Sequence, residues 1–106
     1  MLSKNDAIIY SKAFLKECDM LPVKISRAVL FGSSVKNGMK KDSDIDIALF
    51  SDSFSNNILK NLDLIGKVAI KFPDLDLHTF PSKSYKENGL LIDEIKKTGI
   101  ELMQVE

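Results

Sequence analysis

The segment that most constrains the fold is a short apolar run, residues 44–50, with aspartates at its first and third positions. Side chains alternate between the two faces of a β-strand, so three large aliphatic residues share one face of this run. Asp44 and Asp46 share the other face with Ala48 and Phe50. Two carboxylates on one strand face repel each other and disfavour strand formation. The pattern therefore predicts a buried strand that begins in a functional site.

The rest of the chain alternates between helical and strand patterns. Helices are expected at residues 4–18, roughly 56–71 and about 90–97, and strands at residues 26–31, 44–50 and 74–80. Residues 100–106 are expected to form a last short strand or a tail. Gly99 is expected to end the last helix as its C′ glycine. This order predicts an α/β (α+β) fold in a single small domain, residues 1–106, with a mixed sheet of about four strands and helices packed on it.

The composition argues against several classes of function. Fifteen basic residues balance fifteen acidic ones, so neither stable nucleic-acid binding nor a polybasic membrane tether is expected. Cys18 is the single cysteine, which excludes an internal disulfide and favours a packing role for it. The chain has no apolar run of membrane-spanning length, and its N-terminus lacks the apolar core of a signal peptide. We therefore expect a cytoplasmic protein.

A third carboxylate, in the strand at 74–80, supports a functional role for the acidic pair. Taken alone, an Asp-x-Asp tripeptide is most often an exposed strand end or a helix cap. Asp76, however, lies between two leucines, and it can join the face of Asp44 and Asp46 if the two strands are adjacent. Three such carboxylates can hold two metal ions for phosphoryl or nucleotidyl transfer, and Mg²⁺ suits carboxylate and phosphate oxygens. Asp74 competes for this role, but its position after a proline is typical of a turn.

A Gly-Ser pair precedes the acidic strand. Gly32 ends the strand at 26–31 and allows a ligand to approach the backbone closely. Ser33 can offer its hydroxyl and amide groups to a phosphate, and Lys36, Lys40 and Lys41 can neutralise a triphosphate. The alternative is an ordinary polar, lysine-bearing loop after a strand, so the pair carries weight only together with the acids that follow it.

Together these motifs resemble a known signature. Gly-Ser, ten residues and then Asp-x-Asp is similar to the motif of the nucleotidyltransferase superfamily of the DNA polymerase beta type. Residues 31–50 resemble the minimal nucleotidyltransferases more closely, because Ser43–Asp46 matches their S-D-I-D segment residue for residue. The later segment DLDLHTF is similar to the third-carboxylate strand of that family, which supports Asp76. Asn37 stands where the family usually has glycine, and asparagine is the residue that best replaces glycine in left-handed backbone.

The resemblance implies a polymerase beta-like nucleotidyltransferase fold and transfer of a nucleoside monophosphate, most often AMP from ATP, with Mg²⁺. It also implies a partner, a small helical HEPN-type toxin, which the protein would neutralise as an antitoxin by adding AMP to a tyrosine, by binding, or both. By this resemblance the catalytic and metal-binding residues are Asp44, Asp46 and Asp76, and the nucleotide-binding residues are Gly32, Ser33, Lys36, Asn37 and Ser43.

The sequence leaves open whether the protein is catalytic, what kind of acceptor it uses, and which role His78 has. The protein can be a non-catalytic module that neutralises its partner by occlusion, or an aminoglycoside-type nucleotidyltransferase for small molecules. A chain of 106 residues leaves little room for an acceptor pocket, which favours a protein acceptor. His78 shares a strand face with Asp76, and it either touches the nucleotide and assists proton transfer or is a partly buried, hydrogen-bonded strand histidine. The second role is the more common one.

Overall fold

The computed structural model describes residues 3–32, 45–87 and 89–105. Within them the order of helices and strands is the predicted one, with an additional 3₁₀-helix, η2, between the third strand and the last helix. The elements are α1 (Lys4–Cys18), β1 (Arg27–Phe31), β2 (Ile45–Ser51), α2 (Ile58–Ala69), β3 (Leu75–Pro81), η2 (Ser82–Lys86), α3 (Leu90–Thr98) and β4 (Ile100–Gln104).

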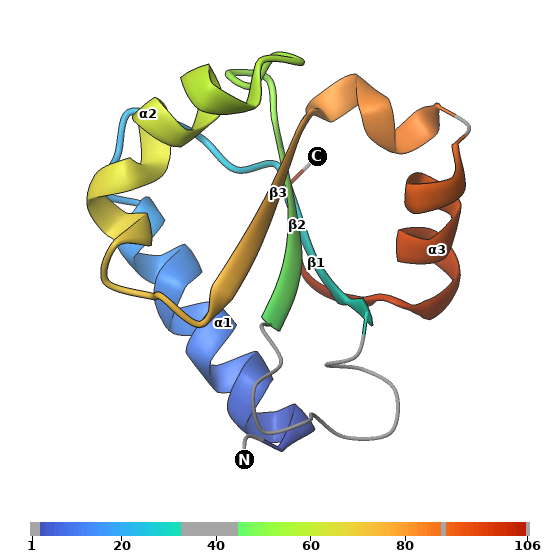
Figure 1. Cartoon of the computed structure of the whole chain (residues 1–106), viewed down its shortest axis with the longest axis horizontal. Helices are drawn as coiled ribbons and strands as arrows, with labels where there is room; N and C mark the ends of the chain where they lie inside the picture. Colours follow the sequence, from blue (N-terminus) through green and yellow to red (C-terminus); the bar gives the residue numbers. More distant parts are fainter. Residues whose placement is uncertain (1–2, 33–44, 88, 106) are drawn as a thin grey trace.

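The described strands form one mixed sheet in the order β3-β2-β1-β4. β1 runs antiparallel to β2 and β4, whereas β2 and β3 are parallel and are joined through α2. A parallel pair requires such a crossover connection. Figure 1 shows the sheet nearly edge-on, with α1 and α2 on one face and α3 on the other. The predicted mixed sheet with packed helices is confirmed.

Both faces of the central strand β2 are covered. Its aliphatic residues Ile47 and Leu49 belong to a core cluster with α1 and α2, and Ala48 and Phe50 belong to a second cluster with α3. Of the seven described residues of β2, Asp46 is the one that is not buried. The alternation in the sequence thus places a single acid at the start of an otherwise buried strand.

Polar side chains define where the helices begin. Ser3 and Asp6 form a capping box at α1, in which each side chain accepts a hydrogen bond from the other residue's backbone N–H. The side chain of Asn57 accepts from the backbone N–H of Lys60, so α2 begins at Ile58, two residues later than expected. None of the described helices combines the length and apolarity that crossing a bilayer requires.

The interpretation of Gly99 as a C′ glycine is wrong. Gly99 is the C-cap of α3, and its φ of −76° is an ordinary extended value. A Cβ at this position would instead collide with the Val29 side chain and the Ile95 carbonyl oxygen. Glycine is needed here because α3 passes directly into β4 against β1, not because the backbone is left-handed.

Candidate active site

Asp46 and Asp76 lie side by side at the start of the parallel strand pair. Asp46 of β2 and Asp76 of β3 are direct partners in the register. Residues in register on neighbouring strands point to the same face of a sheet, so the two carboxylates converge. The side chain of Asp46 is 26% exposed and that of Asp76 is 53% exposed. The acids are thus open to solvent from one side and backed by the core on the other.

His78 completes the cluster from the next position on the same face of β3. Its Nε2 lies 3.1 Å from Oδ1 of Asp46 and 3.5 Å from Oδ2 of Asp76. The imidazole packs edge-on against the Phe31 ring, with centroids 5.0 Å apart. Its register partner on β2 is Ala48, whose small side chain leaves room for the ring. The sequence indicates that His78 and Asp76 share a face, but the contact with Asp46 depends on the strand register.

The environment of Asp46 disfavours its negative charge. Burial raises the pKa of this carboxyl above its ordinary value, and the nearby Asp76 raises it further. The hydrogen bond and charge of His78 act in the opposite direction and lower the pKa. Burial dominates, so the negatively charged form of Asp46 is less favourable here than in water. A bound cation would stabilise that charged form.

Gly32 closes the site from the end of β1. Its φ of +73° lies in the left-handed region, a conformation that residues with a Cβ disfavour. A Cβ on Gly32 would also collide with the carboxylate of Asp46. The glycine of the Gly-Ser pair therefore lies directly against the acidic cluster.

The donor set of the cluster fits a divalent cation. Asp46, Asp76 and His78 each offer one ligand atom, and these atoms all lie within 4.8 Å of one another. Oxygen and imidazole nitrogen ligands suit first-row divalent metals, and the carboxylates also suit Mg²⁺. Asp74 is in the turn before β3, where its backbone N–H donates to the Tyr10 hydroxyl at 3.3 Å. Asp76 rather than Asp74 thus belongs to the cluster.

The remaining predicted site residues lie outside the described part of the chain. They are Ser33, Lys36, Asn37, Ser43 and Asp44.

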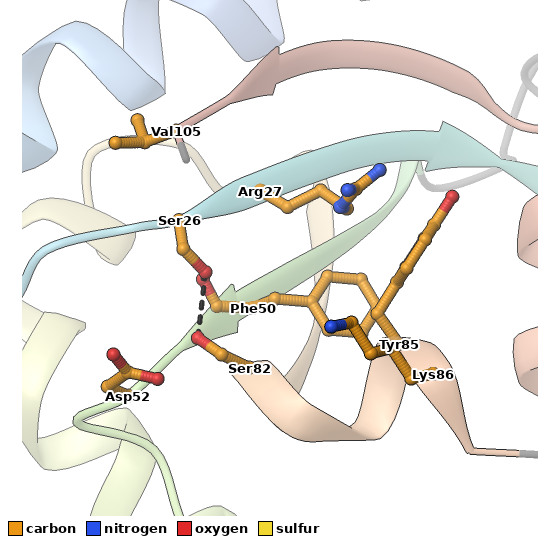
Figure 2. Close-up of a pocket in the computed structure, with 8 residues that line it drawn as sticks. All are labelled: Ser26, Arg27, Phe50, Asp52, Ser82, Tyr85, Lys86 and Val105. Carbon is orange, nitrogen blue, oxygen red and sulfur yellow. Dashed lines mark hydrogen bonds between the residues drawn. The ribbon is translucent and has the colours of Figure 1, made fainter.

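A cavity of about 230 Å³ lies at the other end of the strands (Figure 2), where β1 begins and β2 ends. Ser26 Oγ donates to the Phe50 carbonyl oxygen and lies 2.8 Å from Ser82 Oγ. The Arg27 guanidinium lies 3.7 Å from the centre of the Tyr85 ring and pairs with Glu101 at 2.6 Å. The two serine hydroxyls and the Arg27 guanidinium in this cavity are thus engaged in contacts that join neighbouring elements.

Comparison with known families identifies the family to which this fold belongs. The family model of the nucleotidyltransferase domain matches residues 11–102, which include every described element except the start of α1 and the end of β4. The chain therefore belongs to the nucleotidyltransferase domain family, and it is an enzyme of that class. No curated protein sequence matches the chain significantly.

Several solved structures with a similar fold are chains of toxin–antitoxin complexes. A chain of a mutant MntA–HepT toxin–antitoxin complex superposes with a TM-score of 0.62 at 21% identity, covering 92% of this chain and 74% of that one. A chain of a toxin–antitoxin complex with AMP-PNP gives a TM-score of 0.61 at 24% identity, covering 99% and 76%. A chain of the complex between the tri-AMPylated Shewanella oneidensis HEPN toxin and its MNT antitoxin gives a TM-score of 0.55 at 22% identity, covering 96% of this chain and 73% of that one. At these identities the likeness defines the fold, that of a minimal nucleotidyltransferase.

Proposed function

We propose that this nucleotidyltransferase transfers AMP from ATP to a tyrosine hydroxyl of a small helical HEPN-type partner and thereby acts as an antitoxin. The observation that carries the proposal is the convergence of Asp46 and Asp76 on one open face, in a chain of the nucleotidyltransferase family. The complexes with similar folds support the rest, because one contains AMP-PNP and another contains an AMPylated HEPN toxin with its MNT antitoxin. ATP as substrate fits a cytoplasmic location, which we propose as well.

Within this proposal Asp44, Asp46 and Asp76 hold Mg²⁺, with two ions expected. When bound, the metal supplies charge neutralisation for the triphosphate and for the departing pyrophosphate. Gly32 leaves the backbone at the acidic cluster without a side chain, which lets a phosphate approach. Ser33, Lys36, Asn37 and Ser43 are the proposed contacts to the nucleotide.

The reaction balances as a displacement at the α-phosphorus. The acceptor hydroxyl oxygen forms a bond to the α-phosphorus, the bond from that phosphorus to the β-bridging oxygen breaks, and pyrophosphate leaves. Asp76 is the more exposed of the two described carboxylates, at 53%, and so it is the one more accessible to an acceptor from solution. We assign it the proton that the hydroxyl gives up, which then passes to solvent.

The test is a labelling reaction with the partner protein, Mg²⁺ and ATP labelled at either the α- or the γ-phosphate. Transfer of AMP labels the partner from α-labelled ATP and not from γ-labelled ATP, whereas a kinase gives the opposite result. Tandem mass spectrometry then locates the modified residue. Asp46→Asn and the double variant Asp44→Asn/Asp46→Asn are expected to abolish labelling, because both remove metal-binding charge.

Asp63→Asn is the matched control, since Asp63 is an exposed acid on α2, away from the acidic cluster. It is expected to label the partner at the wild-type rate. Normal labelling by the double variant would refute the assigned chemistry. Neutralisation of the toxin that persists in that variant without ATP would favour occlusion alone, and efficient modification of an aminoglycoside by the isolated chain would refute a protein acceptor.

A further inference from the structure

His78 lies where it can offer a nitrogen ligand, which a metal site made only of carboxylates does not contain. We propose that Nε2 of His78 is a metal ligand, and that with Asp46 and Asp76 it makes a mixed nitrogen–oxygen site that prefers Mn²⁺ to Mg²⁺. The inference rests on the proposed function in one respect, since the same carboxylates hold the metal. It concerns which ion they hold and through which atoms.

The first argument is the direction in which the imidazole points. Nε2 lies 3.1 Å from a carboxylate oxygen of Asp46 and 3.5 Å from one of Asp76, on a different strand. A single N–H can make one good hydrogen bond, and 3.5 Å exceeds the usual N–H···O range. Nε2 is therefore hydrogen-bonded to Asp46 and also faces the Asp76 carboxylate, which lies just beyond hydrogen-bonding distance. A nitrogen this close to carboxylates of two strands meets the first requirement for a shared ion.

The second argument is the spacing of the donor atoms. Neighbouring ligands of a six-coordinate ion with bonds of about 2.1 Å are separated by about 3.0 Å, and those of a four-coordinate ion by about 3.4 Å. The separation of 3.1 Å from Nε2 to Asp46 falls in this range, and that of 3.5 Å to Asp76 lies just above it. Small side-chain rotations would suffice to bring the donor atoms onto one ion.

The third argument is that the ring is held in place. The Phe31 ring contacts it edge-on, Ala48 lies opposite it in the register, and the His78 side chain is 29% exposed. A restrained ligand loses little conformational freedom when it binds metal. Mg²⁺ is held through oxygen ligands and water, whereas Mn²⁺ belongs to the first-row metals that also bind sites containing nitrogen. The histidine thus shifts the site toward the ion that accepts nitrogen.

The test uses the full chain, freed of metal and without an affinity tag that contains histidine. His78 is the single histidine of the sequence, so any imidazole nitrogen bound to Mn²⁺ must come from it. Electron spin-echo envelope modulation with Mn²⁺ alone is expected to show coupling to a ¹⁴N nucleus. Titration followed by the EPR signal of free Mn²⁺, with Mg²⁺ as competitor, gives the ratio of the two affinities.

His78→Gln retains a hydrogen-bond donor beside Asp46, and His78→Phe retains a ring of similar shape without one. Both are expected to lose the nitrogen coupling, and the preference for Mn²⁺ over Mg²⁺ should fall about tenfold. Circular dichroism checks that both variants fold. If His78 only positioned Asp46 and did not bind the metal, its replacement would weaken the binding of both ions equally and leave the ratio of their affinities unchanged.

Three outcomes would overturn the proposal: no Mn²⁺ binding by the wild type, bound Mn²⁺ without nitrogen coupling, or an unchanged affinity ratio in His78→Gln. Failure of AMP transfer is separate from all three. A wild-type chain that shows nitrogen coupling but does not label its partner would refute the proposed function and leave the metal assignment intact.

Discussion

Replacement of Gly32 by alanine tests whether the end of β1 and the acidic cluster form one unit. Gly32 has a φ of +73°, and its missing Cβ would collide with the Asp46 carboxylate. An L-residue in this conformation costs about 1–2 kcal/mol. For a chain of this size each kcal/mol lowers the melting temperature by about 4–8 °C. In addition, the Asp46 carboxylate must rotate away from the new methyl group and thus from Nε2 of His78.

Two measurements separate these effects. Thermal unfolding of Gly32→Ala gives the cost of the backbone strain, and titration with Mn²⁺ gives the damage to the cluster, which we expect to be about tenfold or more in affinity. Gly66→Ala on α2 is the matched control, because nothing lies within 4 Å of its added Cβ. In a helix interior this same substitution should stabilise the fold by about 0.5–1 kcal/mol.

The reasoning is refuted if Gly32→Ala unfolds at the wild-type temperature and binds Mn²⁺ with wild-type affinity. If the variant is less stable but binds Mn²⁺ with wild-type affinity, the predicted collision with Asp46 is refuted and the predicted backbone strain is not.

Three further predictions concern the core. Asn61→Ala should cost about 2–3 kcal/mol in urea denaturation, because the buried amide bonds to the Thr79 hydroxyl and to the backbone N–H and carbonyl of Ser55. Ser11→Ala should raise the free energy of unfolding by about 1 kcal/mol in the same assay, since within the described residues Ser11 Oγ is buried without a hydrogen-bond partner. Burial raises the pKa of the Cys18 thiol to about 12 from an ordinary 9.0, so a thiol reagent at pH 8.5 should label it only on unfolding. The unfolded chain loses this proton first, so stability should fall as the pH rises above about 9, and a stable fold at pH 11 with a rapidly labelled Cys18 would contradict this.

The elements and their faces were predictable because periodicity is local. The alternation of residues 44–50 assigns Ile47 and Leu49 to one face and Asp46 to the other without knowledge of any partner strand, and the structure agrees. The convergence of Asp46 with Asp76 required one further condition, adjacent strands, which hydrophobic patterning does not specify. The family resemblance supplied it.

Contacts between distant segments were not predictable. Residues 82–86 have the composition of a solvated turn, yet they form η2, and Tyr85 packs edge-on against Phe50 with centroids 5.4 Å apart. Arg27, which resembles a surface arginine in the sequence, is 18% exposed because its guanidinium covers the Tyr85 ring. The contact of His78 with Asp46 belongs to the same class. Each pair is far apart in the chain, so its energy depends on packing that no local pattern encodes.

The register of β3 against β2 has a consequence for the folding of this enzyme. Side chains on a strand alternate, so a slip of one residue would turn Asp76 and His78 toward the helices α1 and α2 and expose Leu75 and Leu77 on the opposite face. Such a slip would bury charge and lose apolar packing at the same time. Errors in assembling the site are therefore also errors in folding, so the same apolar packing that stabilises the fold also aligns the acids.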